Sequence, residues 1–258
     1  MISLSVVVIT LNEEKNIGRC LHSVAGIADE IIVVDSHSTD NTVAIAQSFG
    51  AKTIVTEFRG YVAQKNFADA QASNDWIFSI DADEVLSPEL EMSIRQIKFQ
   101  PTFPAYELRR RTNYCGKWIN HCGWYPDKKI RCYNRTKGSW KGEQIHESWQ
   151  LDDPLSALGM LEGDLLHYSY HTLSDHLKQI EKFTDIMARR DVELGKDAGI
   201  CKALFAAKWK FVQSYFIRLG ILDGYAGFQV CLFSAFATYI KYSKIRQYHQ
   251  FKKEGKEY

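Results

Sequence analysis

The sequence predicts an α/β protein with a largely parallel sheet flanked by helices and a helical C-terminal extension. Two observations predict the sheet: short β-branched apolar runs recur in the first hundred residues, and a segment with helical periodicity follows each run. A third observation predicts the extension, because residues 173–258 contain long segments with helical periodicity. Apolar residues make up 45% of the 258 residues, which is ample for a core.

Four buried strands are expected in the first hundred residues, namely Leu4–Ile9, Glu30–Val34, Lys52–Thr56 and a strand that runs from Trp76 to Asp81. Helices are expected between them over 17–24, 43–49 and 61–72. After the fourth strand comes an acidic turn and then Ser87-Pro88, which predicts a capping serine and a proline at the first helical position. A further helix should therefore end near Phe99, followed by a strand over 106–111.

Candidate binding residues stand where three of these strands end. Residues 10–13 follow the first strand, Asp35 ends the second, and Asp81 and Asp83 end the fourth. Ligands bind outside the carboxyl ends of strands in open α/β sheets, so these residues are expected to converge. Two carboxylates in one turn repel each other, which favours a divalent cation such as Mg²⁺ or Mn²⁺. A purely structural acidic turn is the alternative, since Asp is common in turns and near helix N-termini.

Composition argues against several other classes. A net charge of +1 does not suit a nucleic-acid-binding protein, and neither G-x-G-x-x-G after the first strand nor a P-loop motif is present. Residues 1–10 have the pattern of a strand and lack that of a signal peptide, so the six cysteines are expected to be free thiols in a reducing compartment. Cys115, His121, Cys122 and Cys132 are close in sequence, but their spacing matches no standard zinc motif.

Four motifs, taken in order, resemble family 2 glycosyltransferases. They are Thr-Leu-Asn-Glu-Glu at 10–14, Val-Val-Asp-Ser-x-Ser-x-Asp-x-Thr at 33–42, Gln-Lys-Asn at 64–66 and Asp-Ala-Asp-Glu at 81–84. The resemblance covers about residues 1–175. It implies the GT-A fold, a Rossmann-like mixed sheet flanked by helices. It also implies transfer of a sugar from a nucleotide diphosphate sugar with inversion at the anomeric carbon.

The resemblance also implies roles for individual residues. The implied nucleotide-sugar-binding residues are Thr10, Leu11, Glu13, Asp35, Lys65, Asp81 and Asp83. Asp83 would ligate the divalent cation, Mn²⁺ or Mg²⁺, and His167 would complete the metal site in preference to His171. Taken singly, each residue also suits an ordinary structural role, such as a helix cap, a turn or a solvated helix face.

Residues 112–149 are rich in aromatic and basic side chains, which suits an anionic sugar acceptor. The residues assigned to the acceptor are Trp118, Trp124, Tyr125 and Arg131. An irregular β-rich segment with surface charge is the alternative.

An inverting transferase needs a base that takes the proton of the acceptor hydroxyl group. Glu147 is the first candidate, and His146 would orient it or bind phosphate. A His-Glu pair stands at the corresponding point in the family members related to lipopolysaccharide core transferases that the chain resembles. Glu143 and Glu84 are the other candidates for the base. The structural alternative is a strand-edge pair without chemistry.

The C-terminal third predicts association with a membrane. Helical periodicity covers 173–194, and residues 202–219 place basic groups opposite large apolar ones, as in an interfacial helix, although a core helix also fits. Residues 224–240 carry no charge but fall just short of a comfortable span. A tail with six Lys or Arg residues follows and favours anionic headgroups on the cytoplasmic face.

Residues 219–224 and 241–244 are also similar to the end of the lipopolysaccharide inner-core β-1,4-glucosyltransferase group. This similarity implies a peripheral enzyme on the cytoplasmic face of the bacterial inner membrane. It would transfer glucose from UDP-glucose to a heptose of the lipopolysaccharide core–lipid A acceptor. We expect a catalytic domain over 1–172, with a nucleotide-sugar half over 1–100 and an acceptor half over 101–172, and a membrane-associating region over 173–258. The alternatives are another donor, a polyprenyl-phosphate or other surface-glycan acceptor, or a nucleotide-sugar-binding protein without turnover.

Overall fold

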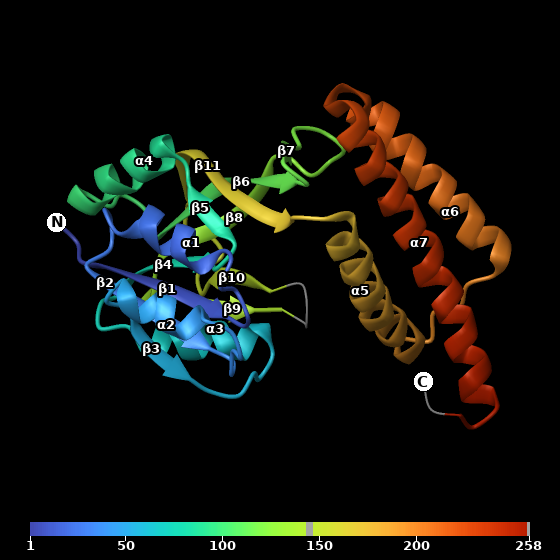
Figure 1. The fold of residues 1–258 in the computed structure, drawn as a ribbon, viewed down its shortest axis with the longest axis horizontal. Coiled ribbons are helices and arrows are strands. Elements are labelled where there is room, and N and C mark those ends of the chain that lie inside the picture. The colour runs from blue at the N-terminus through green and yellow to red at the C-terminus, as the bar shows by residue number, and fades with distance from the viewer. Residues whose placement is uncertain (143–146, 257–258) are drawn as a thin grey trace. The chain divides into compact units, whose positions relative to one another are not determined.

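The computed structural model describes residues 1–142 and 147–256 and confirms the predicted α/β class (Figure 1). The chain forms two compact units. The first, here called the sheet unit, comprises Met1–Arg111 and Asp127–Tyr168, and the second, the helical unit, comprises Thr112–Pro126 and Ser169–Tyr258. Residues 112–126 thus group with the helical unit, whereas the functional division at residue 172 stays a prediction.

The four predicted strands form the parallel half of the sheet. They are β1 (Leu4–Thr10), β2 (Glu30–Asp35), β3 (Lys52–Val55) and β4 (Trp76–Asp81). Strand β1 pairs in parallel with both β2 and β4, and β2 pairs in parallel with β3. Because β1 and most of β4 are buried on both faces, their sequences are nearly continuous apolar runs. This register brings Thr10 level with Asp35 and Ile9 level with Asp81.

Antiparallel pairing makes the sheet mixed and GT-A-like. The strands that follow the parallel half are β5 (Glu84–Leu86), β6 (Ala105–Tyr114), β7 (Lys117–Trp118), β8 (Asp127–Asn134) and β11 (Gly159–Tyr170). The order is β3-β2-β1-β4-β8-β6-β11-β5, and β7 pairs with β6. Strand β5 was not predicted: the sequence indicated a plain turn there, but three residues of the turn region pair with β11.

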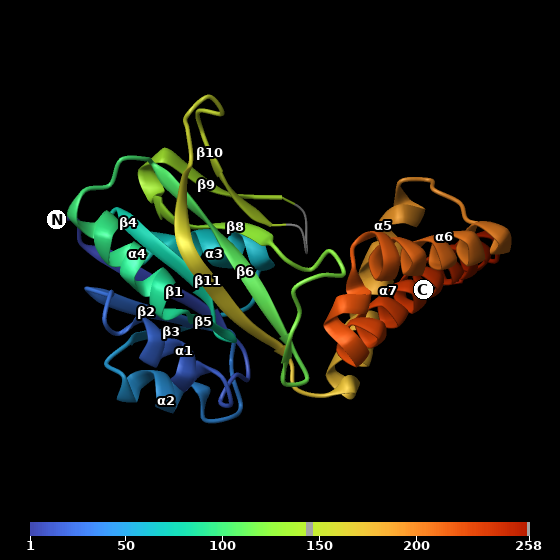
Figure 2. The same cartoon turned by 90° about the horizontal axis from the view of Figure 1, so that it is seen from above.

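Helices and a small second sheet cover the two faces of the main sheet (Figure 2). Helices α1 (Ile17–Val24), α2 (Thr42–Ser48) and α4 (Pro88–Phe99) contribute to the core on one face. On the other face lie α3 (Tyr61–Ala70) and the pair β9 (Gly138–Lys141) and β10 (Ser148–Leu151), and the 3₁₀ turn η1 (Arg135–Lys137) precedes β9. The predicted start of α4 is confirmed, since Ser87 Oγ accepts a hydrogen bond from the Leu90 backbone N–H.

Three long helices dominate the helical unit (Figure 1). They are α5 (Leu173–Glu193), α6 (Ile200–Val212) and α7 (Gly224–Lys253), with a π-helical turn η2 (Gln213–Ile217) and a 3₁₀ turn η3 (Gly220–Asp223) between the last two. Thr172 caps α5 through a reciprocal pair of hydrogen bonds with Asp175. Helix α7 packs against both α5 and α6. A side chain at Gly227 would come within 2.0 Å of the Gly220 carbonyl oxygen, so this close approach requires glycine.

Candidate active site

The candidate site is centred on Asp81, the last residue of β4. Lys65, on α3, places Nζ 2.8 Å from Asp81 Oδ1, and Arg131, on β8, places a guanidinium nitrogen 2.6 Å from Oδ2. Both cationic side chains are almost fully buried. The pairing of β4 with β8 positions Arg131. Phe78 of β4 lies opposite Cys132, so the neighbouring Arg131 lies beside the carboxyl end of β4. The structure thus brings together Asp81 and Lys65, two of the residues predicted to bind the nucleotide sugar.

A second carboxylate, that of Glu84, extends this ion-pair network. Its side chain is completely buried, and Oε1 lies 3.0 Å from Arg131 and 3.1 Å from Arg110 on β6. Its Oε2 accepts a hydrogen bond of 2.9 Å from the Asp81 backbone N–H. Arg110 continues the network to Asp127 at 2.7 Å. Glu84 was an alternative candidate for the base, but a fully paired and buried carboxylate is inaccessible to an acceptor hydroxyl group.

The network shifts the ionisation of its members. Burial alone would raise the pKa of Asp81, but the charges of Arg131 and Lys65 hold that pKa well below its usual value. Burial, followed by the charge of Arg131, lowers the pKa of Lys65, which Asp81 partly offsets. Burial tends to lower the pKa of Arg131, yet Asp81 and Glu84 raise it above its usual value. Asp81 is therefore a fixed negative charge held between two cations.

Asp83 and His167 form the second part of the site. Strand β11 pairs with β5 so that His167 lies opposite Glu84, and the Tyr168 backbone N–H donates to the Asp83 carbonyl oxygen. Asp83 Oδ2 consequently lies 3.1 Å from His167 Nε2. Burial would raise the pKa of Asp83, but the interaction with His167 lowers it. One carboxylate oxygen and one imidazole nitrogen at this spacing suit Mn²⁺ or Mg²⁺, with positions left open for diphosphate oxygens.

A pocket of about 520 Å³ opens beside Asp81. Its walls include Lys65, Asp81, Arg131 and Trp140, together with Glu147, which immediately precedes β10. The Glu147 side chain is one-fifth exposed, and Oε1 lies 4.0 Å from Lys65 Nζ. Lys65 Nζ also lies 4.5 Å from the centre of the Trp140 ring. The pocket thus combines an accessible carboxylate, an aromatic surface and cationic groups, which suits an acceptor sugar.

The loop after β1 and the loop after β2 hold each other in place at the same edge of the sheet. Asp35 is fully buried and accepts hydrogen bonds from the backbone N–H and the hydroxyl group of Ser38. Ser38 Oγ in turn accepts a hydrogen bond from the Asn12 backbone N–H. Glu13 Oε2 accepts a hydrogen bond of 2.7 Å from the side-chain amide of Asn16. Burial raises the pKa of Glu13. Thr10 Oγ1 is buried without a hydrogen-bond partner, and Leu11 is half exposed.

The remaining predicted residues are distributed as follows. Trp118, Trp124 and Tyr125 belong to the helical unit, where the Trp124 ring stacks on Tyr170 with centroids 5.7 Å apart. Arg131, also assigned to the acceptor, is bound instead to the Asp81 network, although it lines the pocket. His146 and Glu143 lie outside the described residues.

The candidate zinc residues form no site. Cys132 lies in the sheet unit, whereas Cys115, His121 and Cys122 lie in the helical unit, where His121 pairs with Asp223 at 2.9 Å. Over residues 1–142 and 147–256, no group of three His, Cys, Asp or Glu side chains is arranged to hold a metal ion. All six cysteines are free, as predicted.

Sequence reasoning missed two features of the site. Arg110 lies in a run of three arginines, and nothing in the run indicates which one points towards Glu84. Asp69 on α3 is buried and accepts from Tyr133 Oη at 2.8 Å and from the indole N–H of Trp140 at 3.1 Å. Burial raises the pKa of Asp69 to about 7, against the effect of these two hydrogen bonds. Its helical spacing of four residues from Lys65 was the available signal.

A GT-A-like mixed sheet with an Asp-x-Asp turn at the end of β4 is the arrangement that the resemblance to glycosyltransferases implies. The chain belongs to glycosyl transferase family 2, whose model matches residues 5–159. A crystal structure of a mycobacterial protein shares the fold, with a TM-score of 0.50 and 17% identity over 67% of this chain and 69% of that one.

Curated relatives that match nearly the whole chain include two glycosyltransferases. An uncharacterized glycosyltransferase of Rickettsia typhi is 34% identical over 96% of this chain and 88% of its own length. The lipopolysaccharide core biosynthesis glycosyltransferase LpsC of Rhizobium meliloti is 31% identical over 96% of this chain and 94% of its own.

Proposed function

We propose that this glycosyltransferase transfers glucose from UDP-glucose to a heptose of the lipopolysaccharide inner core, with inversion at the anomeric carbon. Similarity to LpsC over nearly the full chain supports an acceptor in the lipopolysaccharide core. The observation that carries the reaction type is the accessible carboxylate of Glu147 in the pocket that also contains Asp81.

In this proposal Glu147 is the base. The acceptor hydroxyl oxygen attacks the anomeric carbon from the face opposite the diphosphate, and its proton passes to the Glu147 carboxylate. A new C–O bond forms as the bond between the anomeric carbon and the diphosphate oxygen breaks. The electron pair of the broken bond leaves with UDP. Lys65 Nζ, 4.0 Å from Glu147 Oε1, would help to orient this carboxylate towards the acceptor hydroxyl group.

The donor would bind at the carboxyl ends of β1, β2 and β4. Thr10, Leu11, Glu13 and Asp35 would contact the base and ribose, and the unpartnered Thr10 hydroxyl supports this role. Lys65 would lie near the diphosphate, and Asp81 would orient the ribose or the water shell of the cation.

Asp83 and His167 would hold Mn²⁺ or Mg²⁺, as the carboxylate–imidazole pair at 3.1 Å suggests. The bound cation would neutralise the charge that develops on the departing diphosphate. Before the cation binds, the same pair keeps Asp83 ionised, since His167 lowers the pKa of Asp83 against burial.

The acceptor would be recognised by aromatic and basic groups. In the sheet unit, Arg131 would contribute charge from the pocket wall. In the helical unit, Trp118, Trp124 and Tyr125 are the side chains that would stack on sugar rings. Since lipid A anchors the acceptor in a bilayer, we place the enzyme peripherally on the cytoplasmic face of the bacterial inner membrane. The apolar helical stretch Gly220–Lys253, which comprises η3 and α7, supports membrane association, with a mean hydropathy of 1.2 over an 18-residue window.

A UDP-release assay tests this function. Purified protein is given UDP-glucose, UDP-galactose or UDP-GlcNAc with Mn²⁺ or Mg²⁺, each with and without heptose-bearing truncated lipopolysaccharide. Release with UDP-glucose that requires both acceptor and metal is expected. A parallel reaction supplies a polyprenyl phosphate as the acceptor, and release of UDP only in that reaction would show that the acceptor is a polyprenyl phosphate. Tight UDP binding without release under any condition would favour a nucleotide-sugar-binding protein.

A further inference from the structure

The helical unit exposes many large apolar side chains. They extend from α6 through η2 and η3 to the first turns of α7, and we call this surface the apolar face. Its large side chains that are at least half exposed include those of Leu204, Phe205, Trp209, Ile217, Leu222 and Tyr225. Isolated apolar side chains are normal on a protein surface, but so many large ones exposed on neighbouring elements suit a binding surface.

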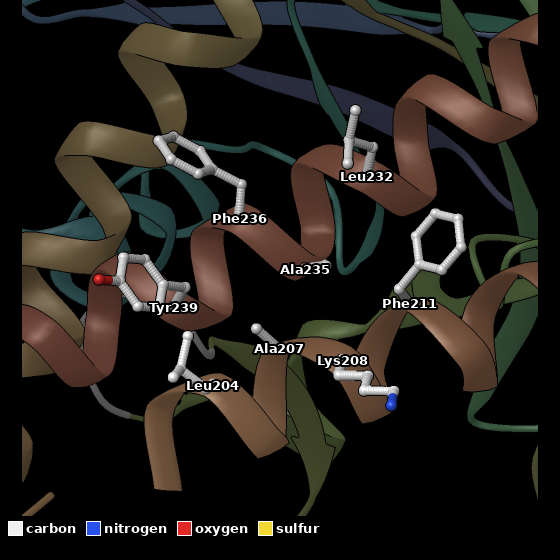
Figure 3. Close-up of a pocket in the computed structure, with 8 residues that line it drawn as sticks. All are labelled: Leu204, Ala207, Lys208, Phe211, Leu232, Ala235, Phe236 and Tyr239. Carbon is white, nitrogen blue, oxygen red and sulfur yellow. The ribbon is translucent and has the colours of Figure 1, made fainter. Parts of the chain in front are cut away.

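A groove between α6 and α7 deepens this face (Figure 3). Its volume is about 470 Å³. Leu204, Ala207 and Phe211 line it from α6, and Leu232, Ala235 and Phe236 line it from α7. The Lys208 ammonium group lies at the rim and points away from α7. An open groove lined by apolar side chains is suited to bind a hydrocarbon chain.

The exposed charges of residues 200–225 have one sign, because the acidic residue in this range, Asp223, is buried and pairs with His121. Residues 200–222 contain Lys202, Lys208, Lys210 and Arg218 but no aspartate or glutamate. Lys202 and Lys208 are exposed on α6, and the Lys202 ammonium group donates a hydrogen bond of 3.3 Å to the Asp197 carbonyl oxygen. Long cationic side chains among large apolar ones can bury their stems in an apolar layer while their heads reach anionic phosphates.

Helix α7 is also fastened to the protein in a way that opposes a transmembrane orientation. Lys241 and Lys244, in its second half, pair with Asp191 and Asp185 of α5 at 3.5 Å and 3.6 Å. Inserting α7 across a bilayer would break these ion pairs. It would also separate the buried side chains of α7, which include Val230 and Ile245, from the residues that they pack against. The helix is therefore suited to lie along a membrane, with its exposed side in contact.

We propose that the apolar face docks on an anionic phospholipid membrane. The large side chains of α6, η3 and α7 enter the boundary between headgroups and acyl chains, and the groove takes one acyl chain. Lys202 and Lys208 contact lipid phosphates. This surface rests on the helical unit alone, so it stands or falls independently of the sugar chemistry.

Vesicle sedimentation with the full-length protein tests the proposal. Vesicles contain either phosphatidylcholine alone or a mixture of phosphatidylethanolamine and phosphatidylglycerol. We expect Phe205→Glu/Trp209→Glu to weaken binding to the anionic vesicles by at least about tenfold. Lys202→Gln/Lys208→Gln should weaken it by about fivefold for each lysine, with little change on phosphatidylcholine.

The matched control is Leu155→Glu/Met160→Glu, which places two acidic groups at exposed apolar positions of the sheet unit and should bind like the unaltered protein. Circular dichroism melts verify that each variant folds. Brominated lipids give a second readout, since they should quench tryptophan fluorescence in the unaltered protein and much less in Trp209→Phe.

Three results would overturn the proposal. They are equal sedimentation of Phe205→Glu/Trp209→Glu and the unaltered protein, no binding to anionic vesicles, and protein that resists alkaline extraction, which indicates a spanning helix. A dimer that dissociates in Phe205→Glu/Trp209→Glu while vesicles fail to bind would assign the face to a second copy.

Discussion

Lys65 Nζ lies 2.8 Å from Asp81 Oδ1, although α3 and β4 are separate elements that meet only in the folded sheet unit. The lysine side chain is only 3% exposed. Removing one partner of a buried pair leaves the other charge without compensation, which costs about 3–5 kcal/mol. Because Arg131 still pairs with Asp81, we expect Lys65→Met to lower the free energy of unfolding by an amount near the lower limit, about 3 kcal/mol.

Urea unfolding of a double-mutant cycle measures this coupling. Lys65→Met should cost far less in an Asp81→Asn background, because the neutral amide leaves no buried charge. Lys52→Met, at an exposed lysine on β3, is the control and should change stability by less than about 0.5 kcal/mol. Equal costs of Lys65→Met in both backgrounds would show that packing of the lysine stem, and not charge pairing, dominates.

Asp69 predicts an unusual dependence of stability on pH. Its pKa is about 7 in the folded protein, against about 3.9 in an unfolded chain. Between these values the folded state holds a proton that the unfolded state has lost, so stability falls as pH rises through this window and then levels off above pH 7. A shift of this size corresponds to at most about 4 kcal/mol.

Urea unfolding of the unaltered protein and of Asp69→Asn between pH 4.5 and 8 measures this pH dependence of stability. The amide oxygen can still accept from Tyr133 and Trp140, so the variant should lose the pH dependence and gain stability at pH 8 relative to the unaltered protein. Asp75→Asn, at an exposed position before β4, should leave the profile unchanged. An unchanged profile in Asp69→Asn would mean that Asp69 is ionised throughout this range.

Predictability from sequence differed between the two halves of the main sheet. Strands β1 and β4 were found because burial on both faces leaves an apolar run, and the residues at their ends followed from strand direction. Strand β5 was missed, because its three residues are held by pairing with β11, about eighty positions later in the chain. Local sequence carries no signal for such pairing.

The candidate site shows the same division. Asp81, Asp83 and Lys65 were identified from motifs, and the structure places Lys65 on Asp81. The burial of Glu84 was not foreseeable, because it depends on arginines from β6 and β8 that reach it only after antiparallel pairing. From the sequence alone, a carboxylate in an acidic turn is expected to be exposed to solvent.

The proposed metal ligands predict a specific defect. Asp83→Ala and His167→Ala should each lower transfer and weaken Mn²⁺ binding in the presence of UDP by at least about tenfold, since each removes a ligand. Electron paramagnetic resonance of free Mn²⁺ measures the affinity independently of turnover. His171→Ala, at an exposed histidine, is the control. Unchanged Mn²⁺ affinity in His167→Ala would assign that imidazole to structure.

Glu147→Gln separates catalysis from binding. Removing a general base lowers the rate of proton transfer by about 10²–10⁴-fold, while the amide has nearly the same shape as the carboxylate. We therefore expect kcat to fall within this range and UDP affinity to stay within about twofold, because the change affects the reacting proton and not the donor contacts. UDP release and calorimetric titration of UDP measure the two quantities. Asp152→Asn, at an exposed carboxylate that follows β10, should match the unaltered protein in both. If Glu147→Gln instead weakened UDP binding and left kcat unchanged, the carboxylate would belong to the donor site and another group would take the proton.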